Sequence, residues 1–208
     1  MTPTGCIWLV LAVLYAAFFG WYTSLGGPLT DEEIARYMAF LEESGDSEVP
    51  LETWRHFMET DTGDDFVMWN IALLRDTPEP IDGAEPGETS MQVVARYFEP
   101  FFERALLRAS HPISNGEATS PPVDLWGVDG AETWDFGTAV RYRSRRDLME
   151  QSVDISPSGI HRFKVAAVEK TIAFPLDPWF HVGDPRILLA MVLVIVGLVL
   201  QLRLAARR

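Results

Sequence analysis

The hydrophobic pattern is most uneven at the two ends of the chain, where long uncharged stretches occur. No charged side chain precedes Asp31, and the first stretch reads CIWLVLAVLYAAFFGWYTSLGG. The second, ILLAMVLVIVGLVLQL, is shorter but is flanked by arginines, whose apolar stems extend it toward the interface. Stretches of this length cross a hydrocarbon core of about 30 Å. The pattern predicts two transmembrane helices, at residues 5–25 and 186–204.

After the first stretch, apolar residues recur with a helical period. Thr30 is a predicted N-cap, and Glu33, three residues on, is its capping-box partner. The next apolar residues fall on one helical face: Ile34, Tyr37, Met38 and Leu41. The segment PLETWRHFMET repeats this pattern. The pattern predicts a helical stalk or cover at residues 29–60.

Residues 64–177 alternate between strand and helix patterns. The apolar run Phe66 to Leu74 is short and bounded by acids, which predicts a strand buried on both faces. A helix containing Pro100 follows, and then two strands around the turn GVDGAE. The second of these strands places four residues on one face: Phe136, Thr138, Val140 and Tyr142. Ser144 begins another helix, which DISPSG interrupts and IHRFKVAAVEK resumes, before a last strand at TIAFPLDP.

The order of these elements is strand, helix, strand, strand, helix, strand. It predicts an α+β domain with the ferredoxin-like βαββαβ arrangement, an antiparallel sheet with both helices on one face. The opposite face requires a cover, either the helices before residue 60 or a second subunit.

The charges at the C-terminus predict the orientation of the two spans. The tail RLAARR contains three arginines and no acid, which is typical of a cytoplasmic end. We therefore expect an inner (plasma) membrane protein with both termini cytoplasmic and residues 26–185 extracytoplasmic. A cleaved signal peptide ending near Ser24-Leu25-Gly26 is the alternative for the first span, but the positively charged segment that such peptides carry is absent from the sequence.

Composition excludes several kinds of chemistry. The sole cysteine is Cys6, within the first predicted span, so an intrachain disulfide and a cysteine-based metal or redox site are excluded. All 30 acidic residues lie between Asp31 and Asp184, and the net charge is −13, which argues against nucleic acid as a partner. The sequence predicts no metal and no cofactor.

Several segments together resemble a known superfamily. They are the LLR that ends the first strand, YFEPFFERALLRASHPI, and above all WDFGTAVRYRSRRDLMEQ with HRFKVAAVEKTIAFP. These segments, within about residues 60–176, resemble small uncharacterised domains of the dimeric α/β-barrel superfamily. The resemblance implies a homodimer packed sheet against sheet, with a cavity between sheet and helices in each protomer. The two spans and the acidic helices before residue 60 depart from the usual soluble member.

Four arginines occupy six positions: Arg141, Arg143, Arg145 and Arg146. The first two point the same way from a strand, and the others begin a helix, where an anion is favoured. One hypothesis is a carboxylate or phosphate site that includes Arg141, Arg143 and Arg145. The other is pairing with nearby acids, namely Glu132, Asp135, Asp147 and Glu150.

His161 completes the predicted ligand-binding set, because histidine is a general base near neutral pH and a haem ligand. The sequence places Glu169 two helical turns further on, but no second ligand stands at metal spacing, so a structural role is the alternative.

The superfamily includes cofactor-independent monooxygenases, haem enzymes and domains without known activity, so the fold alone does not select a function. The sequence contains no recognisable catalytic motif. We therefore expect a membrane-tethered, non-enzymatic domain that binds a partner or a small ligand. The alternatives are a monooxygenase-like oxidoreductase acting on a small hydrophobic substrate, and an accessory subunit bound to another membrane protein.

Overall fold

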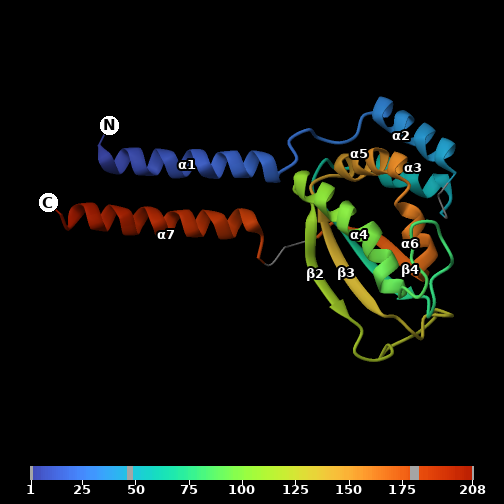
Figure 1. Cartoon of the computed structure of the whole chain (residues 1–208). Coiled ribbons are helices and arrows are strands. Elements are labelled where there is room, and N and C mark those ends of the chain that lie inside the picture. Colours follow the sequence, from blue (N-terminus) through green and yellow to red (C-terminus); the bar gives the residue numbers. More distant parts are fainter. Residues whose placement is uncertain (1, 46–48, 179–182, 208) are drawn as a thin grey trace. The chain divides into compact units, whose positions relative to one another are not determined.

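The structure, a computed structural model, describes residues 2–45, 49–178 and 183–207 (Figure 1). Their contacts divide the chain into two compact units. One unit contains both ends of the chain, residues 1–25 and 178–208, and the other extends from Gly26 to Asp177. The second unit is an α+β domain with a four-stranded antiparallel sheet, so the predicted α+β class is confirmed.

The first unit consists of two apolar helices, α1 (Pro3–Tyr22) and α7 (Pro185–Ala205), which match the two predicted stretches. Both are long and apolar enough to cross a membrane. They pack closely, because a Cβ atom added to Gly197 would lie 2.6 Å from the Trp8 ring. The indole Nε1 of Trp8 also donates a hydrogen bond to Oε1 of Gln201 (3.0 Å).

The second unit is built on a sheet of four strands, β1 (Phe66–Leu74), β2 (His111–Glu117), β3 (Phe136–Tyr142) and β4 (Val168–Leu176). Their order across the sheet is β2-β3-β1-β4, and each neighbouring pair is antiparallel. In this register Asn70 of β1 lies opposite Thr138 of β3 and Ala173 of β4. The predicted bounds of β1 are confirmed, and so is the shared face of the four β3 residues, because all four line one cavity.

Two predicted boundaries were wrong. The connection between β2 and β3 runs from residue 118 to residue 135, far longer than the turn GVDGAE. The last strand begins at Val168, so the preceding helix ends at Ala167 and Glu169 lies on β4 rather than on the helix of His161. The β-branched Val168 pairs with Leu74 of β1, and this sheet contact outweighs the local helical pattern.

One face of the sheet is covered by helices α4 (Ser90–Leu107), α5 (Arg145–Ile155) and α6 (His161–Ala167), with a short 3₁₀ turn, η1 (Ser156–Ser158), between the last two (Figure 1). The α4 and α6 helices bury Val93, Val94 and Phe163 against Ala72 of β1. The α5 helix buries Leu148 in a cluster with Phe66, Val140 and Tyr142 of the sheet.

The helices before residue 60 are α2 (Asp31–Ser44) and α3 (Leu51–Glu59). The predicted capping box of Thr30 and Glu33 is present at the start of α2. The four predicted apolar residues of α2 are buried in a cluster with Met58 of α3 and Met149 of α5. These two helices therefore cover α5, which lies on the helix side of the sheet, rather than the opposite face.

The opposite face of the sheet, here called the outer face, exposes large apolar side chains. Trp69, Ile172, Phe174 and Leu176 retain 40%, 42%, 41% and 44% of their accessible surface. The prediction that β1 is buried on both faces was therefore wrong for the outer face. A continuous apolar run is also found in a strand whose second face is left open, and periodicity does not separate the two cases.

Candidate functional site

A cavity of about 760 Å³ lies between the helix-covered face of the sheet and helices α4, α5 and α6. Its volume is within the range of roughly 300–1,000 Å³ that is typical of small-molecule sites. The sheet contributes Met68, Asn70 and Thr138 to the wall, and α4 contributes four aromatic residues: Tyr97, Phe98, Phe101 and Phe102.

The sequence of α4 explains why aromatic rings gather on this side. The segment YFEPFF repeats a pair of aromatic residues after four positions, and residues four apart lie on one helical face. The rings contact each other, with centroids 5.3 Å apart for Tyr97 and Phe101 and 5.4 Å apart for Phe101 and Phe102. The rings therefore contact one another and form one wall of the cavity.

The cavity wall is mainly apolar, but it includes the charged residues Glu79, Arg162 and Lys164 and two tyrosine hydroxyls. Tyr97 of α4 and Tyr142 of β3 both line it. Among the described residues, neither hydroxyl has a hydrogen-bond partner. Burial raises the pKa of both tyrosines, and the pKa of Tyr142 is raised further by the charge of Tyr97. Both side chains are therefore neutral phenols that retain a proton to donate.

Asn70 places an amide on the sheet side of the cavity. Its Nδ2 donates hydrogen bonds to the carbonyl oxygens of Met68 (3.1 Å) and Thr138 (3.4 Å). These bonds orient the side chain, and within the described chain its Oδ1 accepts no hydrogen bond. The amide oxygen is therefore one acceptor that the cavity presents alongside the two phenol donors.

His161 is the predicted ligand residue that borders the cavity. It is the first residue of α6, and its ring lies 5.9 Å from the Tyr97 ring in an edge-on arrangement. No group of histidine, cysteine and carboxylate side chains suited to a metal occurs among the described residues. The structure thus brings His161 to the cavity and the three predicted arginines to other positions, described next.

Arg141 is buried in the second unit, with 1% of its surface exposed. Its Nε donates to Oδ2 of Asp65 (2.8 Å), and its Nη1 donates to the carbonyl oxygen of Ala109 (2.7 Å). Ala109 follows α4 in the left-handed conformation (φ 51°), which is costly for a residue with a Cβ atom. Arg141 thus joins the start of β1 to the chain that leaves α4.

Arg143 and Arg145 also have internal partners. Arg143 binds the Asp147 carboxylate with two hydrogen bonds, of 2.8 and 2.6 Å, and this raises the pKa of Arg143. Arg145 donates to Thr60 Oγ1 (2.8 Å) and to the carbonyl oxygen of Phe57, and its guanidinium lies over the Phe57 ring. These contacts tie the start of α5 to the end of α3.

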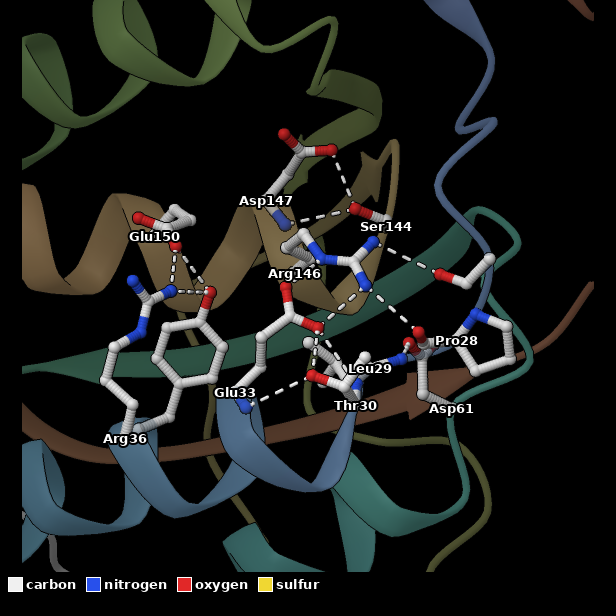
Figure 2. Close-up of polar contacts among 12 residues, drawn as sticks. Pro28, Leu29, Thr30, Glu33, Arg36, Asp61, Ser144, Arg146, Asp147 and Glu150 are labelled. Carbon is white, nitrogen blue, oxygen red and sulfur yellow. Dashed lines mark hydrogen bonds and ion pairs between the residues drawn. The ribbon is translucent and has the colours of Figure 1, made fainter.

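Arg146 connects α5 to the segment that precedes α2, as Figure 2 shows. Its guanidinium binds both carboxylate oxygens of Glu33 (2.6 and 3.0 Å) and the carbonyl oxygens of Gly27 (3.1 Å) and Pro28 (3.0 Å). Hydrogen bonding from Arg146, supported by Thr30, lowers the pKa of Glu33 to about 2.

The same segment is held from a second side. The carboxylate of Asp61 accepts a hydrogen bond from the Leu29 backbone N–H (2.8 Å). Gly63 packs directly on it, since an added Cβ atom would lie 2.4 Å from the Gly27 carbonyl carbon. Residues 27–29 are therefore held against the rest of the α+β unit.

Of the four acids predicted to pair with the arginines, Asp147 does so. Glu150 instead accepts hydrogen bonds from Tyr37 (2.6 Å) and Arg36, both on α2 (Figure 2). Asp135 accepts a hydrogen bond from the Leu74 backbone N–H (2.6 Å). The acids that bind the other arginines are distant in sequence, and no spacing rule identifies them. Anion binding by Arg141, Arg143 and Arg145 stays a prediction.

Comparison with known proteins finds likeness at the level of the fold. No family model matches the sequence, and no curated protein matches it. The structure is similar to RPA0582, a protein of unknown function from Rhodopseudomonas palustris, with a TM-score of 0.50, 24% identity, and coverage of 64% of this chain and 97% of that chain. The methylated form of RPA0582 gives a TM-score of 0.51, 24% identity, and coverage of 66% and 96%.

At3g17210 from Arabidopsis thaliana has a TM-score of 0.35 and 12% identity, with coverage of 56% of this chain and 97% of that chain. This likeness is too low to support an argument. The likeness to RPA0582 supports the α+β architecture alone and carries no information on activity.

Proposed function

We propose that this chain is a membrane-anchored protein whose ferredoxin-like domain binds one small, largely apolar molecule in the cavity between its sheet and its helices. The observation that carries the proposal is the cavity itself, about 760 Å³ in volume and walled by the aromatic residues of α4. A void of this size with apolar walls loses dispersion contacts along its whole lining, and an apolar ligand restores them.

The strand order supports the ferredoxin-like part of the proposal. Across the sheet, in the order β2-β3-β1-β4, strand β3 lies between β1 and β2, and strand β1 lies between β3 and β4. Two such split crossovers, each with its helices on the same face, are what the βαββαβ arrangement requires. The resemblance of residues 60–176 to the dimeric α/β-barrel superfamily points to the same fold.

The membrane part of the proposal rests on α1 and α7. Each contains an 18-residue apolar stretch that is almost fully exposed within the protein: none of its residues is buried in α1, and 6% are buried in α7. Helices so apolar and so exposed are stabilised by lipid. With the arginines after α7 in the cytoplasm, the α+β unit is extracytoplasmic.

Native mass spectrometry of the full-length protein, gently extracted in detergent, tests the ligand proposal. The expected spectrum shows a small molecule that stays with the folded chain and is released on denaturation. The matched variant is Ala173→Trp, which puts an indole into the cavity wall opposite Asn70 and should abolish retention. Ile172→Trp is the control, because the adjacent strand position points to the outer face. Equal retention by both variants, or no retained molecule at all, contradicts the proposal.

The proposal includes a homodimer formed through the outer face. The exposed residues Trp69, Ile172 and Phe174 form an apolar surface that a two-fold axis makes self-complementary. The variant Ile172→Cys, in a Cys6→Ser background, should form a disulfide between two chains under mild oxidation. The control is Ala173→Cys in the same background, which lies on the cavity face and should not form this disulfide. Another membrane protein cross-linked at Ile172 in place of a second copy would favour the accessory-subunit alternative.

One observation favours an enzyme as the second candidate, because His161 and Tyr97 share a cavity wall and so place a candidate general base beside any bound molecule. A monooxygenase-like reaction would change the mass of the retained molecule during aerobic incubation, and His161→Gln would stop the change without preventing retention. An unchanged mass over many hours supports the binding protein.

A further inference from the structure

We infer that the molecule bound in the cavity carries an acceptor oxygen, a carbonyl or a carboxylate, and that the hydroxyls of Tyr97 and Tyr142 donate hydrogen bonds to it. This inference rests on the proposed function and names the class of ligand that the same cavity takes.

The starting point is a difference among the buried tyrosines. Tyr37 is fully buried between α2 and α5, and its hydroxyl donates a hydrogen bond to Glu150 Oε1 (2.6 Å). Tyr142 is buried and Tyr97 is partly buried, yet within the described residues their hydroxyls have no protein partner. Both hydroxyls therefore keep a donor proton that a ligand in the cavity can use.

The two hydroxyls belong to side chains that line one cavity. Tyr97 comes from α4 and Tyr142 from β3, on facing walls of the same cavity. A carbonyl or carboxylate oxygen has two lone pairs, so one oxygen accepts from both phenols.

Both rings are held in place before a ligand arrives. The Tyr142 ring is stacked on Phe66 with centroids 5.3 Å apart, and the Tyr97 ring contacts Phe101. Fixed donors bind an acceptor without a further loss of side-chain entropy. The remainder of the wall is mainly aromatic and aliphatic, so the rest of the ligand is apolar.

Three probes of matched shape test the inference on the full-length chain in amphipol: fluorene, which lacks an acceptor, 9-fluorenone, which has a carbonyl, and fluorene-9-carboxylate. Equilibrium dialysis against protein-free amphipol measures each affinity. We expect one or both oxygen-bearing probes to bind more tightly than fluorene. Tyr97→Phe and Tyr142→Phe should each weaken that probe roughly threefold to tenfold and leave fluorene unchanged.

Tyr37→Phe is the matched control, since it removes a buried phenol hydroxyl outside the cavity and should leave all three affinities unchanged. Tighter binding of fluorenone than of the carboxylate identifies a neutral carbonyl ligand, and the reverse identifies an acid. If fluorene binds as well as both oxygen-bearing probes, or if the tyrosine variants change nothing, the inference is overturned while the cavity remains a binding site. If no probe binds, the proposed function fails together with the inference.

Discussion

The arginine cluster (Arg141, Arg143, Arg145 and Arg146) and the cavity are both rich in groups that recognise ligands, but their polar atoms are used differently. Each arginine donates to carboxylate, hydroxyl or carbonyl oxygens of the same α+β unit. The phenols of Tyr97 and Tyr142 have no such partners in the described structure.

The difference separates residues that hold the fold together from residues that are available to a ligand. A guanidinium already bound to a carboxylate must lose that partner before it binds an outside anion, and the broken pair leaves an uncompensated charge. A phenol that faces an apolar cavity gains a hydrogen bond from a ligand and loses none. Changes in the arginine cluster should therefore alter stability, and changes in the cavity should alter binding.

The largest effect is expected for Arg141→Met. It leaves Asp65 and the Ala109 carbonyl without their buried donor, and loss of one partner of a buried pair costs about 3–5 kcal/mol of unfolding free energy. Thermal unfolding of the full-length protein in amphipol should show a large fall in Tm. Arg162→Met removes an exposed arginine and should stay within about 0.5 kcal/mol. Equal effects of the two variants would show that the Arg141 contacts do not stabilise the fold.

Gly63→Ala should be the next most damaging change. Its Cβ atom would meet backbone atoms at 2.4 Å (Gly27 C) and 2.7 Å (Pro28 N), at a φ of +83°. We expect a loss of about 2–4 kcal/mol, from strain at the residue and displacement of the fixed segment. Gly87→Ala is the matched control, because its φ is +89° but no atom lies within 4 Å of the added Cβ, so it should lose only about 1 kcal/mol. Similar losses would mean that the close approach adds nothing.

Ala173→Trp tests the cavity, the second of the two regions compared. We expect at least a tenfold loss of affinity for the tightest of the three fluorene probes, about 1.4 kcal/mol, because the indole occupies ligand space. The unfolding free energy should change by less than about 1 kcal/mol, since Ala173 is exposed at the cavity wall. Equilibrium dialysis and thermal unfolding of the same sample measure both. A variant that loses stability but keeps its affinity would reverse the assignment of the two regions.

Glu33→Gln should give the smallest effect, and one that depends on pH. Gln preserves the capping box, so the variant isolates the charge that Arg146 binds. Since the pKa of Glu33 is about 2 in the folded chain and near 4.5 when unfolded, its contribution is complete above pH 4.5 and is lost as the pH falls toward 2. Wild type should exceed the variant by about 1–2 kcal/mol at pH 7 and by almost nothing at pH 2.

Unfolding measured at several pH values gives this difference directly. Glu42→Gln, a change at an exposed position of the same helix, is the control and should give no such trend. A Glu33→Gln difference that stays constant down to pH 2 would contradict a charge-based contact with Arg146.

Much of the fold could be predicted because it depends on local periodicity and capping. The two apolar helices, the strand from Phe66 to Leu74, the capping box at Thr30 and the shared face of the β3 residues all follow from short spacings. The site was only partly predictable. His161 was identified and borders the cavity, whereas Tyr97 and Tyr142, which line it with free hydroxyls, were missed because each fits the apolar pattern of its element.

The sequence by itself determined which segments are helices and strands, and that the ends are apolar enough for a bilayer. Its single cysteine, Cys6, has no second cysteine with which to form a disulfide within the chain. These properties depend on composition and on neighbours within a few positions. Tertiary structure decided where Val168 changes from helix to strand, which acids bind which arginines, and which tyrosines keep a free hydroxyl. Those outcomes depend on contacts between residues as far apart as Glu33 and Arg146. A long-range contact forms only when the sheet and its helices are packed, and it has no spacing signature along the chain.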